Sequence, residues 1–138
     1  MPRYLVVANQ TLGGDHLIDA IRERMEVGRC SFHVLVPATP PEDHVWTETE
    51  AKASAQERLD LALARFRGMG AEADGEVGDH RPLDAIADAV QAGDYDEIIL
   101  STFPQGVSRW LRLDLPHRVQ SSFGLPVTHI VSREADEL

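Results

Sequence analysis

The stretch that decides the fold is residues 4–25, "YLVVANQTLGGDHLIDAIRERM". Residues 4–8 are a short apolar run between polar neighbours, which predicts a buried strand. A turn with two glycines follows, and apolar side chains then recur at helical spacing between Leu17 and Met25. Asp15 is available to cap the start of this helix. The stretch therefore predicts a strand, a glycine turn and a helix, in that order.

The same alternation continues along the chain. Further strands are expected at 31–38, 71–79, 96–101 and 125–131, of which 71–79 is the most polar. Helices are expected at 47–69 and 81–93, and a last helix is expected through about Ser122. Strands that alternate with helices favour right-handed crossovers and a parallel sheet covered on both faces. We expect an α/β fold of three layers, with a five-stranded parallel sheet, in a single domain over residues 1–138.

Charge and cysteine content exclude several classes of partner and point to a compartment. The formal net charge is −10 and the pI is about 4.9, which opposes binding to nucleic acid or to an anionic membrane surface. The single cysteine, Cys30, forms no internal disulfide, as expected in a reducing cytoplasm. The apolar run at 4–8 is shorter than the core of a signal peptide. We expect a cytoplasmic protein without a membrane segment.

Candidate ligand contacts follow two of the predicted strands. In open parallel sheets, ligands bind beyond the carboxyl ends of strands, where the strand order reverses. The turns after 4–8 and 96–101 would face this crevice. Gly13 and Gly14 expose backbone N–H groups at a helix start, which favours an anion, although a plain turn explains them as well. Arg109 and Arg112 add guanidinium groups that bind phosphate or carboxylate, or they lie on a solvated helix face.

Motifs for catalysis and metal binding are missing from the sequence. There is no P-loop, no Gly-x-Gly-x-x-Gly and no Gly-x-Ser-x-Gly, and the histidines have no metal-binding spacing. Ser108, Asp114 and His117 are residue types that acyl transfer uses, and His117 is also a candidate ligand contact. His33 and His129 lie inside predicted strands and are interpreted as core or interface residues.

Several segments resemble the universal stress protein family in their order and letters. They are "YLVVANQT", "GEVGDHRPLDAIADA", "YDEIILST", "SRWLRLDLPHRV" and "GLPVTHIV", and together they run along nearly the whole chain. The resemblance implies a Rossmann-like sheet with a ligand crevice. It also implies a homodimer in which the closing strand, Val127 to Val131, pairs edge to edge with its copy.

The family's ATP motif is degenerate here. ATP-binding members carry Gly-x2-Gly-x9-Gly-Ser/Thr, and the alignment places Leu100, Phe103, Leu113 and Asp114 at its four positions. Asn9 stands where those members have an Asp. A side chain in place of glycine keeps the backbone away from a phosphate, and Asp114 would repel one. The resemblance therefore does not predict ATP as cofactor, and the cofactor stays unassigned.

Three functions remain open from the sequence. The first is a non-catalytic, stress-protein-like cytoplasmic regulator that dimerises. The second is a binding module for a small phosphorylated or anionic metabolite, and the third is a nucleotide or ester hydrolase. The predicted ligand-binding residues, for any of these, are Asn9, Thr11, Gly13, Gly14, Val77, Gly78, Ser101, Thr102, Ser108, Arg109, Arg112 and His117.

Overall fold

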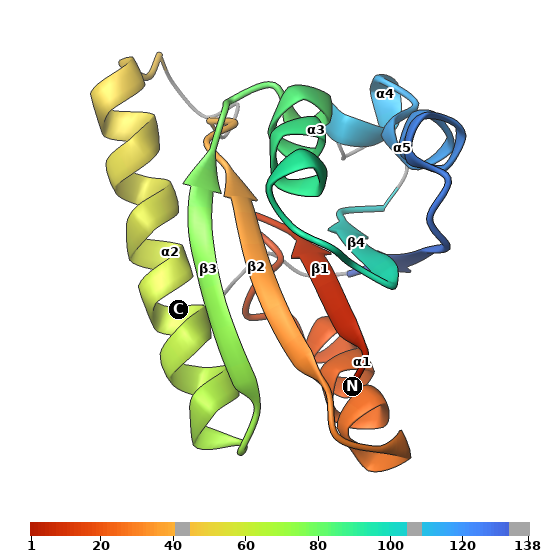
Figure 1. Ribbon diagram of the computed structural model, residues 1–138. Coiled ribbons are helices and arrows are strands. Elements are labelled where there is room, and N and C mark those ends of the chain that lie inside the picture. The colour runs from red at the N-terminus through yellow and green to blue at the C-terminus, as the bar shows by residue number, and fades with distance from the viewer. Residues whose placement is uncertain (41–44, 105–108, 133–138) are drawn as a thin grey trace.

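A computed structural model describes residues 1–40, 45–104 and 109–132 of the chain (Figure 1). The strands in this part of the chain are β1 (Arg3–Val7), β2 (Ser31–Pro37), β3 (Glu72–Gly78), β4 (Glu97–Thr102) and β5 (Val127–Val131). The helices there are α1 (Asp15–Val27), α2 (Glu48–Gly68), α3 (Pro82–Ala92), α4 (Arg109–Arg112) and α5 (Leu115–Phe123). None of these helices combines the length and apolar character that crossing a membrane requires.

The strands form one sheet in the order β3-β2-β1-β4-β5, and every neighbouring pair is parallel. This confirms the predicted α/β fold with a five-stranded parallel sheet. The chain builds outward from β1 through β2 to β3 and then returns to the other side of β1 with β4. The strand order therefore reverses between β1 and β4, which is where ligands bind in folds of this kind.

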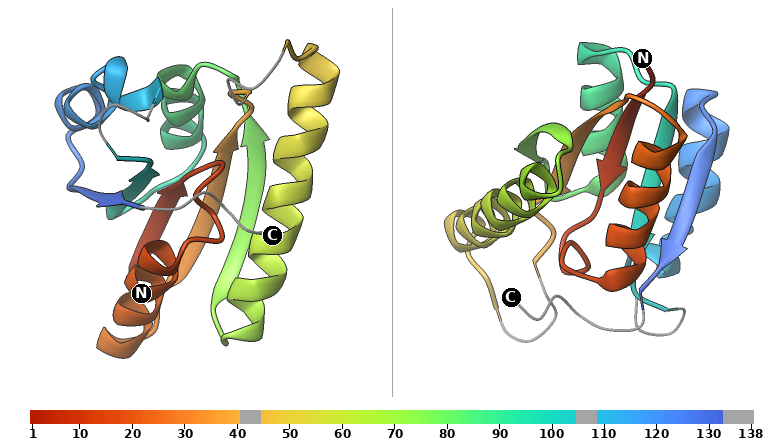
Figure 2. Two further views of the ribbon diagram at one scale, coloured as in Figure 1. Left: turned by 180° about the vertical axis from the view of Figure 1, so that it is seen from behind. Right: turned by 90° about the horizontal axis from the view of Figure 1, so that it is seen from below.

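Helices cover both faces of the sheet, giving the three layers that Figure 2 shows from two sides. On one face, Val6, Val34 and Ile99 pack against α1 and α2 in one buried cluster. On the other face, Leu5, Leu35 and Leu100 form a second buried cluster with α3, α4 and α5. Because alternate residues of a strand point to opposite faces, strands covered on both sides carry unbroken apolar runs, as residues 4–7 of β1, 34–37 of β2 and 98–100 of β4 do.

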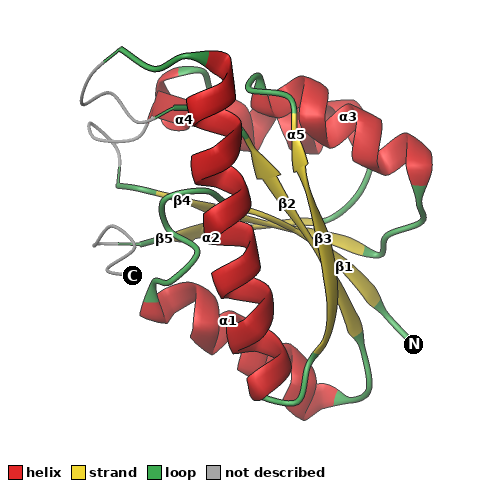
Figure 3. Cartoon of the chain, turned by 90° about the vertical axis from the view of Figure 1, so that its left-hand side faces the viewer, coloured by secondary structure: helices red, strands yellow, loops and turns green. Residues whose placement is uncertain are grey.

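The long helix α2 lies against β2 and β3, near the edge of the sheet (Figure 3). Its start is well defined, since Thr47 Oγ1 accepts from the Glu50 N–H and the Glu50 side chain accepts from the Thr47 N–H. This reciprocal capping box satisfies two donors that a helix start otherwise leaves unpaired. Ala51, Ala55 and Leu59 on its inner side are buried.

Two local predictions differ from the structure. The helix α1 is capped by Gly14 rather than Asp15, which is the first helical residue. The last helix is divided into α4 and α5, because Asp114 takes a left-handed backbone conformation with φ of 55°. Asp is one of the few residues with a side chain that adopt this conformation readily.

Candidate functional site

Two hydroxyls meet at the point where the strand order reverses. Thr11 follows β1 and Ser101 is the next-to-last residue of β4, and their hydroxyl oxygens are 2.7 Å apart. Both side chains are buried, with exposed fractions of 2% and 0%. The structure therefore brings these two predicted residues together, with each hydroxyl bonded to the other.

Asn9, the residue at the family's Asp position, is held by three hydrogen bonds. Its Nδ2 donates to Pro37 O and Thr39 O, each at 3.0 Å, and its Oδ1 accepts from Arg58 Nη1 at 3.0 Å. The amide thus joins β1 to the loop after β2 and to α2. The side chain of Arg58, which the helical pattern of α2 places among the solvated residues, is instead partly buried and points at this edge of the sheet.

The glycine turn after β1 is shaped by close packing. The Gly14 N–H donates to Thr11 O at 3.0 Å, and a Cβ at Gly14 would lie only 2.6 Å from Ser132 Oγ. The carbonyl of Gly13 accepts from Arg65 Nη1 of α2 at 3.2 Å. This approach of Ser132 explains the glycine at position 14 without a ligand.

At the end of β4, Thr102 contacts the closing strand. Its Oγ1 lies 2.8 Å from His129 Nε2 and 2.9 Å from Phe103 O. Burial of the imidazole lowers the pKa of His129 below its ordinary value of 6.5. The side chain of His129 is exposed at its outer part and bonds β5 to the end of β4 through Thr102.

The segment after β4 places few of its predicted residues in a crevice. Ser108 lies outside the described residues, as does the side chain of Arg109, and Arg112 is exposed on α4. His117 is exposed on α5, with Nδ1 3.2 Å from Asp114 Oδ2. The structure brings Asp114 and His117 together, but at the surface.

Trp110 was not recognised from the sequence as a residue of this region. Its side chain is 7% exposed and belongs to the cluster of α3, α4 and α5, while its Nε1 donates to Thr39 Oγ1 at 3.3 Å. Thr39 Oγ1 in turn donates to His80 O at 2.5 Å. One indole therefore ties the segment after β4 to the loops that follow β2 and β3. A tryptophan next to Arg109 and two residues before Arg112 was the available signal.

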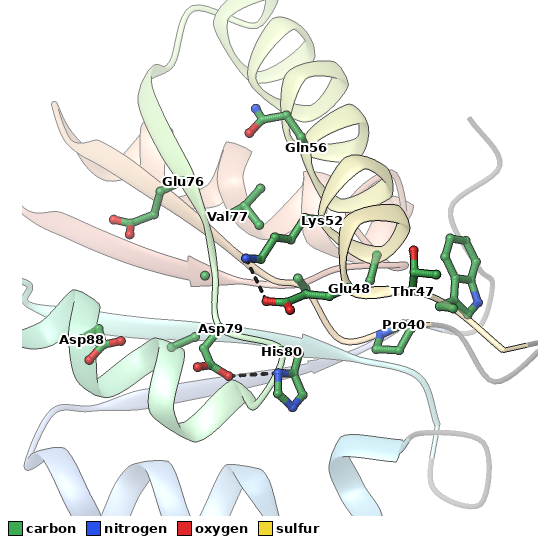
Figure 4. Close-up of a pocket in the computed structure, with 15 residues that line it drawn as sticks. Pro40, Thr47, Glu48, Lys52, Gln56, Glu76, Val77, Asp79, His80 and Asp88 are labelled. Carbon is green, nitrogen blue, oxygen red and sulfur yellow. Dashed lines mark ion pairs between the residues drawn. The ribbon is translucent and has the colours of Figure 1, made fainter.

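An open cavity of about 810 Å³ lies at the carboxyl ends of β2 and β3, between the starts of α2 and α3 (Figure 4). We call it the β3 cavity. The apolar and small residues that line it are Ala38, Pro40, Trp46, Ala51, Val77, Gly78 and Ala85, and the polar ones are Thr47, Glu48, Lys52, Gln56, Glu76, Asp79, His80 and Asp88. Two of the predicted ligand residues, Val77 and Gly78, are in this set.

Charged groups of the β3 cavity are mostly paired with each other. Lys52 Nζ is 3.0 Å from Glu48 Oε1, and His80 Nδ1 is 3.3 Å from Asp79 Oδ1 (Figure 4). Arg81 donates to Asp79 from its backbone and side chain, and these bonds lower the pKa of Asp79. Glu76 Oε2 is 2.7 Å from His33 Nε2, whose ring is largely buried.

The arrangement suits ligand binding. Cavities of 300 to 1,000 Å³ with an apolar lining and a few polar groups are typical of small-molecule sites, as a rough range. Among the described residues, no group of three or more His, Cys, Asp or Glu side chains is placed to hold a metal ion.

Comparison with known proteins identifies the fold. No family model and no curated protein matches the sequence. The fold is the Rossmann-like α/β fold of universal stress proteins. A universal stress protein from Archaeoglobus fulgidus is 18% identical, with a TM-score of 0.65, over 94% of this chain and 93% of that chain.

Two similar structures hold a bound nucleotide. One is a universal stress protein family protein from Arabidopsis thaliana with AMP bound, 12% identical over 96% of this chain and 93% of that chain, with a TM-score of 0.65. The other is a universal stress protein in complex with cAMP, 14% identical over 94% of this chain and 96% of that chain, with a TM-score of 0.61. At these identities the likeness concerns the fold.

Proposed function

We propose that this protein is a non-catalytic regulatory protein of the universal stress protein type, which binds a small molecule in the β3 cavity. The observation that carries the proposal is the cavity itself, which lies at the carboxyl edge of a parallel sheet. Its lining comes from α2, β3 and α3 and from the loops beside them, and it includes Val77 and Gly78. Similar folds with AMP and cAMP support a ligand built on a nucleoside.

The residues at the family's ATP motif support binding without a triphosphate. Leu100 is fully buried in β4, and Leu113 is exposed at the turn between α4 and α5. Asp114 follows with a left-handed backbone and a carboxylate near His117. A carboxylate and bulky side chains at these positions offer a phosphate chain none of the backbone approach that glycines allow.

A second candidate is an anionic metabolite held between the turn at Thr11–Gly14 and the segment 101–112. Its support is the reversal of strand order between β1 and β4, next to the Thr11 and Ser101 hydroxyls. A ligand there would have to compete with the bond between these two hydroxyls.

The protein is further proposed to be cytoplasmic and to form a homodimer through β5. This strand is an edge of the sheet, and its letters Val-Thr-His-Ile-Val carry no formal charge when His129 is neutral. Val131 is 41% exposed. Sedimentation of the wild type at micromolar concentration should give a dimer, and Val131→Lys should shift it toward monomer.

The experiment that tests the site is an amide chemical-shift titration with adenosine. We expect the perturbed signals to be those of Ala51, Val77 and Gly78. Perturbation centred on Thr11 and Ser101 would transfer the site to the crevice between β1 and β4. A titration that moves neither group would remove the proposal.

A further inference from the structure

We propose that the β3 cavity selects against phosphate and takes an uncharged or cationic small molecule of nucleoside size. This inference rests on the ligand site proposed above and specifies the class of ligand that it binds. It follows from which charged side chains around the cavity already have partners and which do not.

The basic side chains that line the β3 cavity already have acidic partners. Among the described residues these are Lys52, bonded to Glu48, and His80, in contact with Asp79. Arg81, just outside the lining, is bonded to Asp79 and Asp84. A phosphate entering the cavity would have to break one of these pairs before it gained a cation of its own.

The carboxylates are in excess. Glu76, Asp79 and Asp88 lie on the side formed by β3 and α3, while the pair of Lys52 and Glu48 extends from α2 (Figure 4). Asp88 has no hydrogen bond or ion pair with any residue in the described part of the chain, which leaves its charge available to a ligand. Like charges brought together are repelled, so this side of the cavity opposes an anion and attracts a cation or a hydrogen-bond donor.

The helix starts at the cavity do not reverse this sign. The positive end of a helix attracts anions, and both α2 and α3 begin here. However, α2 carries Glu48 and Glu50 in its first turn and α3 carries Asp84. The Thr47 hydroxyl already accepts the N–H of Glu50. The carboxylates of the protein itself therefore already offset the positive ends of both helices.

The test compares adenosine with AMP, a matched pair that differs by one phosphate, by calorimetry at low salt on the full-length protein. We expect AMP to bind roughly tenfold more weakly, and the difference to shrink as salt screens the carboxylates. Asp88→Asn should strengthen AMP binding about threefold or more and leave adenosine binding within about twofold. Asp19→Asn is the matched control, since it removes an equal charge from the exposed side of α1.

The outcomes separate the two proposals. If AMP binds as tightly as adenosine while shifting the amides of Ala51 and Val77, the site stands and the selection against phosphate is wrong. An equal gain in AMP affinity from Asp19→Asn would also refute the inference, because it would reflect total charge rather than the cavity. If neither compound shifts these amides, the site itself fails, and the inference fails with it.

Discussion

Removing one hydroxyl of the Thr11 and Ser101 pair should destabilise the protein more than removing both. Ser101→Ala leaves Thr11 Oγ1 buried without its bonding partner, and Thr11→Val does the same to Ser101 Oγ. A buried polar group left unpaired costs about 1–3 kcal/mol, whereas replacing both partners by apolar groups is close to neutral. We therefore expect each single variant to lose about 1–3 kcal/mol of unfolding free energy.

The double variant Thr11→Val with Ser101→Ala should lose less than the sum of the two single losses. Because the double variant is expected to be close to neutral, the coupling, by which it is more stable than additivity predicts, approaches the sum of the two single losses, about 2–6 kcal/mol. Urea unfolding followed by tryptophan fluorescence measures all three, and Ser121→Ala on the exposed side of α5 controls for loss of a serine hydroxyl. That control should stay within about 0.5 kcal/mol of the wild type.

Additive losses would refute the reasoning, since they would mean that the hydroxyls do not satisfy each other. Single losses within about 0.5 kcal/mol would refute it as well, because each remaining hydroxyl would then have another partner. The result also bears on the second candidate function. Hydroxyls that are strongly coupled to each other are a poor phosphate site, because binding would have to break their bond first.

Three further predictions concern other contacts. Partial burial lowers the pKa of His129 in the folded protein below 6.5. The stability that the unprotonated ring allows above pH 6.5 is therefore lost as the pH falls through this lowered pKa. His129→Gln should reduce the fall in Tm between about pH 7 and 5. Gly75→Ala should cost about 1–3 kcal/mol in urea unfolding, since its Cβ would lie 2.6 Å from both Val34 O and Leu59 Cδ1, whereas Gly28→Ala meets nothing within 4 Å. Trp110→Phe should lose about 1 kcal/mol or more by the same measurement, because it keeps an aromatic ring but removes the bond to Thr39 and part of the buried indole, and an unchanged midpoint would show that this bond is dispensable.

The sheet could be predicted because each strand lies close to the apolar or alternating stretch of sequence that indicated it. Residues 4–8 and 98–100 are unbroken apolar runs, since both faces of β1 and β4 are covered there. The most polar strand, β3, was still recognisable, and its alternation has a structural reason. Asp74 and Glu76 point to one face at an edge of the sheet, while Val77 points to the side of α2.

The candidate site was only partly predictable because it depends on contacts between distant segments. Asn9 and Arg58 are 49 residues apart, and the pattern of α2 gives no sign that Arg58 reaches the end of β1. Val77 and Gly78 were identified through a family resemblance rather than through their chemistry. Both line the β3 cavity, and their contact with a ligand stays a prediction.

The two edges of the sheet differ in what they allow the protein to become. On β3, the carboxylates of Glu72, Asp74 and Glu76 would face their own copies if two such edges approached. On β5, no such repulsion stands between two copies of Val127–Val131. Pairing of identical edges about a two-fold axis closes once it has formed, and the remaining outer edges are then both acidic. Growth into a fibre is blocked by charge at each end, so the proposed dimer is also the point at which strand-by-strand association stops.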